Sequence, residues 1–161
     1  MIRDAKPADF PAIVRINTQS EHFLSPLLLQ RLQLLHSQAA CLRVAGGGEE
    51  VEAFLLAFRE GAAYDSPNYL WFAQRYPQFL YIDRVAVRPA SQGRGLGTQL
   101  YRDLIAFAGR AGVPRVTCEY DVDPPNAVSA AFHAKFGFTQ VGQQSYGAAG
   151  KTVALQELRI G

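Results

Sequence analysis

The sequence predicts a mixed α/β fold in which helices cover the faces of a central sheet. Short apolar segments alternate along the chain with longer segments whose apolar residues recur at helical spacing. The chain has 161 residues, of which 48% are hydrophobic, and this is enough to bury the core of one domain. We therefore expect a single domain over residues 1–161. The composition excludes a disordered, collagenous or coiled-coil protein.

The first third of the chain predicts one strand and two helices. Ile2–Ala5 has the length of an edge strand. Asp9 is a suitable N-cap for a helix that runs to about Thr18. Ser25 and Pro26 are expected to open a second, leucine-rich helix, because serine caps helices and proline is tolerated in the first turn.

A hairpin and an unusually long connection follow. Cys41–Ala45 and Val51–Arg59 predict two strands joined by the glycines at 46–48. The connection from Gly61 to Gln78 is rich in aromatic residues, and we expect a short helix around Tyr69–Tyr76. Long loops in compact domains are usually functional or disordered, and this aromatic content argues against a disordered linker.

The second half alternates strands with helices and completes the order β-α-α-β-β-β-α-β-α-β-β. Gly112 and Gly137 end the two helices. The predicted strands are Phe79–Val87, Arg115–Val122, Phe138–Val141 and Thr152–Ile160, and the predicted helices are Leu96–Ala108 and Asn126–Phe136. The strand Phe79–Val87 has apolar residues on both of its faces, as a central strand should have.

Charge and cysteine content exclude several classes of function. A formal net charge of +2 creates no field for nucleic acid or an acidic membrane. Cys41 and Cys118 stand far apart and outside any CxxC pair, so neither a metal site nor a disulfide scaffold is expected. No apolar run is long enough for a membrane span, and the N-terminus resembles no signal peptide. We expect a cytoplasmic protein.

The most specific motif is the glycine loop Gln92–Gly97, which follows a strand and opens a helix. Its backbone N–H groups and the helix N-terminus can together cradle a phosphate. A P-loop is excluded because no Lys precedes Thr98. A dinucleotide-binding loop fits at Gly93 and Gly95 but lacks the last glycine, although Glu119 lies where a ribose-binding acid belongs.

Three segments, in the right order and spacing, resemble the GNAT acetyltransferases. The loop Gln92–Gly97 is similar to the acyl-CoA-binding signature Gln-x-x-Gly-x-Gly of that family. Ile82–Pro89 resembles the preceding strand and turn, and Asn126–Phe138 resembles the later Asn-to-Gly-Phe helix. The resemblance implies a mostly antiparallel sheet splayed at the cofactor site and acetyl-CoA as the cofactor. The implied reaction is direct transfer of the acetyl group to a primary amine of a small molecule or amino acid.

The resemblance also implies which residues hold the cofactor. The pantetheine arm would pair with the exposed backbone of one strand, and the pyrophosphate would sit on the loop amides. The implied residues are Val85, Ala86, Val87, Gln92, Gly93, Arg94, Gly95, Leu96, Gly97, Thr98, Asn126, Ser129 and His133. The segment Phe79–Gly97 holds the whole net charge of the chain, with three arginines against one aspartate, which favours a small anionic ligand.

Acyl transfer to an amine needs a base, an oxyanion donor and an acid for the leaving thiolate. Asp83 and Glu119 are the candidate bases, although Asp83 can equally form an ion pair with a neighbouring arginine. The resemblance implies a backbone N–H near Val85 as the oxyanion donor. Where the family often carries a tyrosine acid, this chain has His133, which can also be a packing residue, and Tyr120 is a substitute donor.

The acceptor is expected to bind beside the aromatic connection. The candidate acceptor-binding residues are Tyr64, Asp65, Tyr69, Trp71, Asp83 and Glu119. Aromatic faces can hold a cationic amine, but the same segment can be a lid that packs only on the protein. A non-catalytic acyl-CoA-binding module on the same fold is the alternative function, and an NAD-binding enzyme ranks third. A homodimer is common in the family.

Overall fold

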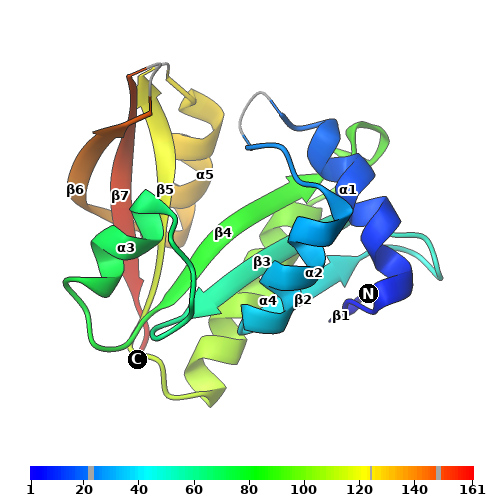
Figure 1. Ribbon diagram of the computed structural model, residues 1–161, viewed down its shortest axis with the longest axis horizontal. Coiled ribbons are helices and arrows are strands. Elements are labelled where there is room, and N and C mark those ends of the chain that lie inside the picture. Colours follow the sequence, from blue (N-terminus) through cyan, green and yellow to red (C-terminus); the bar gives the residue numbers. More distant parts are fainter. Residues whose placement is uncertain (22–23, 124, 148–149) are drawn as a thin grey trace.

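The computed structural model describes residues 1–21, 24–123, 125–147 and 150–161 (Figure 1). Its strands are β1 (Ile2–Asp4), β2 (Cys41–Ala45), β3 (Ala53–Arg59), β4 (Leu80–Val87), β5 (Arg115–Asp123), β6 (Thr139–Tyr146) and β7 (Lys151–Arg159). Its helices are α1 (Phe10–Thr18), α2 (Leu29–Gln38), α3 (Pro67–Ala73), α4 (Leu96–Arg110) and α5 (Ala127–Phe136), with short 3-10 turns at Pro7–Asp9 and Pro89–Ser91.

The strands form one seven-stranded sheet in the order β1-β2-β3-β4-β5-β7-β6. All neighbouring strands are antiparallel except β4 and β5, which are parallel. The parallel pairing covers only Leu80 with Val116 and Tyr81 with Thr117, and beyond it the two strands diverge (Figure 1). The expectation of a mostly antiparallel sheet that splays beside the predicted central strand is therefore confirmed.

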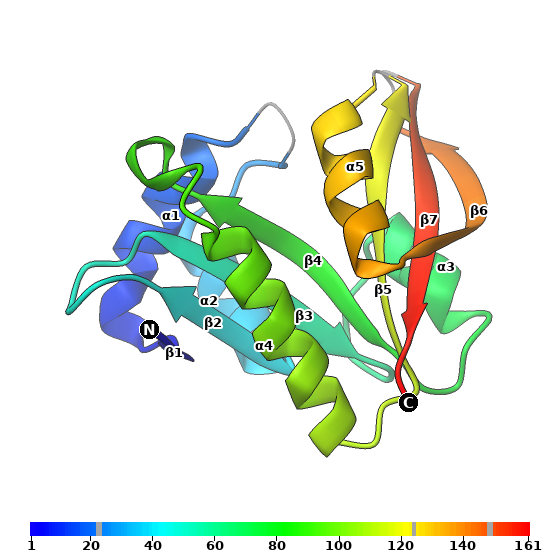
Figure 2. The same cartoon turned by 180° about the vertical axis from the view of Figure 1, so that it is seen from behind.

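Helices cover both faces of this sheet, and the alternation of β3 shows why. Phe54, Leu56 and Phe58 point to the face that α1, α2 and α3 cover, whereas Leu55 and Ala57 point to the face that α4 covers. Figure 2 shows α4 and α5 on that second face. Because both faces carry apolar residues, two core layers form, one on each face of the sheet. The divergence of β4 and β5 interrupts the sheet between these two strands. Within the described ranges, no helix has the length and apolar character that a membrane crossing requires.

The second helix begins later than predicted. α2 starts at Leu29 and not at Ser25–Pro26, and the side chain of its N-cap residue, Leu28, makes no capping hydrogen bond. Ser25 is held elsewhere, because Arg84 Nη1 donates to its carbonyl oxygen at 2.7 Å and Arg84 Nη2 donates to its Oγ at 3.0 Å. Ser25 therefore binds Arg84 of β4 and does not cap α2.

Three other local predictions need correction. Asp9 does not cap α1 with its side chain; it accepts hydrogen bonds from the Lys6 amide at 2.8 Å and from Arg3. The helix in the aromatic connection lies at Pro67–Ala73, because Pro67 supplies its first turn. β6 extends to Tyr146, well beyond the predicted end at Val141, since it pairs along the length of β7.

Candidate active site

A cavity of about 1180 Å³ lies where β4 and β5 diverge. Its walls come from β4, the glycine loop, the first residues of α4, β5, α5, residues 20–21 and 24–31, and the start of α3. Elements that are far apart in the sequence therefore meet at one opening in the sheet. The cavity extends from the predicted phosphate loop to the candidate bases.

The glycine loop lies at the end of this cavity where the sequence predicts the phosphates. Gly93 and Gly95 have φ angles of +82° and +80°, a backbone conformation that side chains with a Cβ rarely adopt. Gly95 is also the N-cap of α4, so the exposed amides of the loop and the first turn share one concave surface. The predicted cofactor residues that line the cavity are Val85, Ala86, Val87, Gln92, Gly93, Gly95, Leu96, Gly97, Thr98, Asn126, Ser129 and His133.

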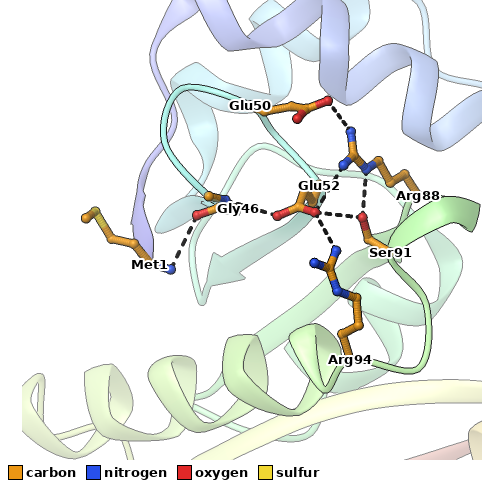
Figure 3. Close-up of polar contacts among 8 residues, drawn as sticks. Met1, Gly46, Glu50, Glu52, Arg88, Ser91 and Arg94 are labelled. Atoms are coloured by element: carbon orange, nitrogen blue, oxygen red, sulfur yellow. Dashed lines mark hydrogen bonds and ion pairs between the residues drawn. The ribbon is translucent and has the colours of Figure 1, made fainter.

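Arg94 is the predicted cofactor residue that does not line the cavity. Its Nη1 lies 3.0 Å from Glu52 Oε1, behind the loop (Figure 3). Arg88 likewise pairs with Glu50 and Glu52. Carboxylates from outside the segment Phe79–Gly97 thus neutralise Arg88 and Arg94. The net positive charge of this segment is therefore no argument for an anionic ligand. The backbone amides of the loop carry the case for a phosphate site.

Asp83 on β4 has both carboxylate oxygens engaged. Tyr64 Oη donates to Oδ1 at 2.5 Å, and Arg84 Nε donates to Oδ2 at 3.0 Å. The expected alternative of an ion pair with a neighbouring arginine is therefore present. Burial raises the pKa of Asp83, while Arg84 and the Tyr64 hydrogen bond act in the opposite direction. Arg84 also contacts Asn17 and Ser25, so this carboxylate belongs to a network that ties α1 and the segment before α2 to the sheet.

Glu119 on β5 is in a different electrostatic state. Its Oε1 accepts a hydrogen bond from Tyr81 Oη at 2.7 Å, and no cation lies in contact with it among the described residues. Burial, with the nearby charge of Asp83, raises the pKa of Glu119 to about 8 in spite of the Tyr81 hydrogen bond. A carboxyl group that titrates near neutral pH suits proton transfer.

His133 is buried between α4 and β5, and both of its ring nitrogens have partners. Nδ1 lies 2.7 Å from the carbonyl oxygen of Ser129, and Nε2 lies 2.7 Å from Tyr101 Oη. Burial lowers the pKa of His133. A neutral imidazole must place its proton on Nδ1, because a carbonyl oxygen can only accept, so Nε2 accepts from Tyr101. The ring of Tyr120 lies parallel to that of His133, at a centroid distance of 6.3 Å.

At the acceptor end the aromatic residues divide into two groups. Tyr64 and Asp65 line the cavity, although Asp65 is largely exposed and lies 3.9 Å from Arg31. Tyr69 and Trp71 are absent from the cavity wall. Tyr69 donates to the carbonyl oxygen of Arg59 at 2.7 Å from within the core, and Trp71 packs beneath the Arg75 guanidinium. These two residues form the packing lid that was the alternative expectation.

The family model for the acetyltransferase (GNAT) family matches residues 18–138, which is more than half of the chain. The chain belongs to the GNAT acetyltransferase family. This finding confirms the expected family, and it agrees with the splayed sheet and the loop at the head of α4. No curated protein matches the sequence closely enough to count as a relative.

Solved structures show the same GNAT fold. Ard1 from Thermoplasma volcanium superposes with a TM-score of 0.80 at 17% identity, covering 99% of this chain and 97% of that one. The ribosomal-protein-S18-alanine N-acetyltransferase of Escherichia coli gives 0.76 at 18% identity, covering 99% and 93%. yncA of Salmonella typhimurium, solved with its cofactor acetyl-CoA, gives 0.74 at 21% identity, covering 100% and 94%.

Sequence reasoning missed two tyrosines that contact the candidate catalytic residues of this GNAT domain. Tyr81 lies two positions before Asp83 on β4, so strand alternation alone places both side chains on one face. Tyr101 sits on the apolar face of α4, where its spacing indicates only a core residue. Its contact with His133 depends on how two helices pack, and no local pattern reveals that.

Proposed function

We propose that this GNAT protein is an N-acetyltransferase that moves an acetyl group from acetyl-CoA directly to a primary amine of a small molecule or an amino acid. The observation that carries the proposal is the single cavity that joins the glycine loop, the open edge of β4 and Glu119. It offers a place for a long anionic donor at one end and a titratable carboxyl group at the other.

The residues at the donor end fit acetyl-CoA. Among the described residues, the edge of β4 that faces β5 has no strand partner beyond Tyr81, so its backbone groups can pair with an extended amide-bearing arm. The amides around Gly93 and Gly95 suit a pyrophosphate, and Asn126 fixes the start of α5 by accepting a hydrogen bond from the Ser129 amide at 3.1 Å. When bound, acetyl-CoA supplies an activated acetyl thioester.

Glu119 is the proposed base. Asp83 has a hydrogen-bond or ion-pair partner on each oxygen, whereas Glu119 has one donor, Tyr81, and a pKa of about 8. In the proposed reaction Glu119 takes a proton from the attacking nitrogen, directly or through a water molecule. Asp83 instead keeps Tyr64 and Arg84 in place at the acceptor end, and the amide of Val85 remains the proposed oxyanion donor.

Tyr120 is the proposed acid. The partners of His133 direct its one ring proton to the Ser129 carbonyl, which leaves no proton on the nitrogen that faces Tyr101. Tyr120 lines the same cavity as Glu119 and stacks on the His133 ring.

In the proposed reaction the C–N bond forms as the amine attacks the thioester carbon, and the Val85 amide would stabilise the negative charge on the carbonyl oxygen. Glu119 accepts the proton from nitrogen, and Tyr120 gives a proton to the sulfur as the C–S bond breaks. Loss of the Glu119 proton to solvent and uptake of a proton by Tyr120 restore both residues.

The two cysteines support direct transfer over an acyl-enzyme route. Cys118 lines the cavity, but burial raises the pKa of its thiol well above the ordinary value. Burial raises the pKa of Cys41 to about 12, and Cys41 is not part of the cavity wall. Both groups stay protonated at neutral pH, and a thiol is a poor nucleophile compared with a thiolate.

The test is acetyl-CoA turnover with a panel of acceptors, followed by CoA release and by mass spectrometry of the acetylated product. The panel holds small primary amines, free amino acids and short peptides with free N-termini. We expect turnover with small amines or amino acids. Turnover with peptides alone would contradict the proposed acceptor class. Tight CoA binding without acetylation of any amine would favour the non-catalytic acyl-CoA-binding module.

A further inference from the structure

Behind the glycine loop lies a polar cluster that the proposed reaction does not use. We call it the Glu52 cluster; Figure 3 shows it around the Glu52 carboxylate. Its members are Gly47, Glu50, Glu52, Arg88, Ser91 and Arg94. The cluster joins the turn between β2 and β3 to the segment that precedes α4.

Glu52 is the centre of this cluster. Its Oε1 accepts hydrogen bonds from Ser91 Oγ at 2.8 Å, Arg94 Nη1 at 3.0 Å and Arg88 Nη2 at 3.1 Å. Its Oε2 accepts from the Gly47 amide at 3.0 Å. The Glu52 side chain is only 12% exposed. Both oxygens therefore accept hydrogen bonds, and those from Ser91 and Gly47 lower the pKa of Glu52, which keeps it ionised.

The loop has few other anchors. Within the part of the chain that the structure describes, the side-chain hydrogen bonds that leave residues 88–95 end on Glu50 or Glu52, apart from one that Gln92 Nε2 donates to the carbonyl oxygen of Val87 on β4 at 3.3 Å. The Arg88 amide also donates to the backbone carbonyl of Glu52 at 2.8 Å. Gly93 and Gly95 give the loop wide conformational freedom. An external carboxylate must therefore select one loop shape.

The anchors differ in strength. Ser91 is fully buried, and its Oγ also accepts a hydrogen bond from Arg88 Nε at 2.7 Å. The Arg94 side chain is 63% exposed and reaches Glu52 with one nitrogen. Ser91 thus fixes the base of the loop, while the exposed Arg94 contact adds little, as is usual for surface ion pairs.

We propose that Glu52 is a positioning residue for donor binding, because its contact with Ser91 holds the glycine loop in the shape that receives the phosphates. This inference rests on the proposed use of acetyl-CoA and adds a residue to it. Glu52 touches no reacting atom and acts through Ser91 and the loop backbone. Its effect belongs to the phosphate end of the donor and not to the acetyl-transfer step.

The test is Glu52→Gln, which keeps the size of the side chain and removes its charge. We expect the Kd of CoA, measured by calorimetry, to rise by about tenfold or more, since hydrogen bonds to a charged group are lost. The KM of acetyl-CoA rises in parallel while kcat changes by less than about twofold. Acetyl-pantetheine, a donor without phosphates, keeps its wild-type KM.

Glu50→Gln is the matched control. Glu50 contacts Arg88 from the outside and its side chain is 67% exposed, so the Kd of CoA should change by less than about twofold. Ser91→Ala keeps the carboxylate and removes the contact; it should shift the Kd of CoA in the same direction as Glu52→Gln, and it replaces that variant if Glu52→Gln does not fold.

Three results would decide against the inference. If Glu52→Gln or Ser91→Ala binds CoA as tightly as the wild type does, this inference is wrong while the proposed function stands. An equal rise in KM for acetyl-CoA and acetyl-pantetheine indicates general damage to the site and contradicts it as well. A wild-type protein that binds no CoA contradicts both this inference and the proposed function.

Discussion

Glu119 and Asp83 line one cavity on neighbouring strands, yet their surroundings assign them different tasks. Asp83 is held between a tyrosine hydroxyl and a guanidinium, at the proposed acceptor end of the cavity. Glu119 meets one tyrosine hydroxyl, and burial leaves its proton bound up to about pH 8. A pair of carboxyl groups separated in this way by their environments can divide structural and proton-transfer roles.

Glu119→Gln removes the proposed base. We expect kcat/KM to fall by about 10²–10⁴-fold, the usual contribution of a general base. In the wild type, kcat/KM should rise with pH and level off above about 8. That limb should disappear in the variant. The measurement uses an acceptor amine of low pKa, so that the rise of kcat/KM with pH does not come from titration of the acceptor. A rise whose midpoint follows the pKa of the acceptor would contradict the assignment.

The same substitution should stabilise the free protein at high pH. The pKa of Glu119 is raised from 4.5 to about 8 on folding, so the wild type loses stability as pH rises between these values. Glutamine carries no such penalty. The free energy of unfolding of Glu119→Gln should exceed that of the wild type by on the order of 2 kcal/mol at pH 8.5 and match it near pH 4. Urea titrations at both pH values measure this, and a difference independent of pH would contradict it.

Tyr120→Phe tests the proposed acid. We expect kcat to fall by about 10²-fold with little change in the Kd of CoA, because the ring and its stacking on His133 remain. Retained turnover in Tyr120→Phe would return the protonation step to His133 or to water.

At the scale of elements, α3 is held against the sheet by a close approach that only glycine permits. A Cβ at Gly142 on β6 would overlap the Trp71 ring, 2.8 Å from its Cη2 atom. Trp71 cannot retreat freely, because Arg75 covers it at 3.8 Å from the ring centroid and Phe72 packs against it. The position of α3, and with it Asn68 at the cavity wall, depends on this contact.

Gly142→Ala should therefore destabilise the protein by about 1–3 kcal/mol, as overpacking of a tight core contact does. Chemical denaturation measures the change. Gly109→Ala on α4 is the control, since a Cβ there meets no neighbour within 4 Å and alanine favours a helix. A Gly142→Ala protein as stable as the wild type would show that Trp71 is free to move.

The elements that local chemistry controls could be predicted from the sequence, and those set by distant partners could not. The glycine loop and the Gly137 stop on α5 follow from backbone conformation alone. Ser25 has the local properties of a cap, but Arg84, 59 residues further along the chain, binds it instead. Arg94 was expected to meet phosphate, and its partner Glu52 lies 42 residues before it. Contacts of this kind require the register of the sheet.

At the scale of the whole molecule, several charges are balanced by partners from other elements, beside pairs such as Asp83 and Arg84 that lie within one strand. Arg88 before the glycine loop and Arg94 within it take carboxylate partners from the β2–β3 turn, and Lys151 on β7 pairs with Asp121 on β5. Counting charges along the sequence therefore misrepresents the field at the site. Neutral ion pairs lie beside the proposed phosphate site, which is made of backbone amides.

The short pairing of β4 with β5 divides the sheet into two halves with few backbone pairings between them. One half holds β1 to β4, the other holds β5, β7 and β6, and two residue pairs join their backbones. A donor bound between them would contact both halves and stabilise their relative positions. At 100 times its Kd, CoA should stabilise the protein by about 2.7 kcal/mol and raise Tm by about 5–10 °C. Amide exchange should slow most at the diverging ends of β4 and β5, while the β2–β3 hairpin serves as the internal reference. Without a donor, the sheet has its fewest backbone pairings between β4 and β5, where acetyl transfer is proposed to take place, and donor binding would join the two halves there.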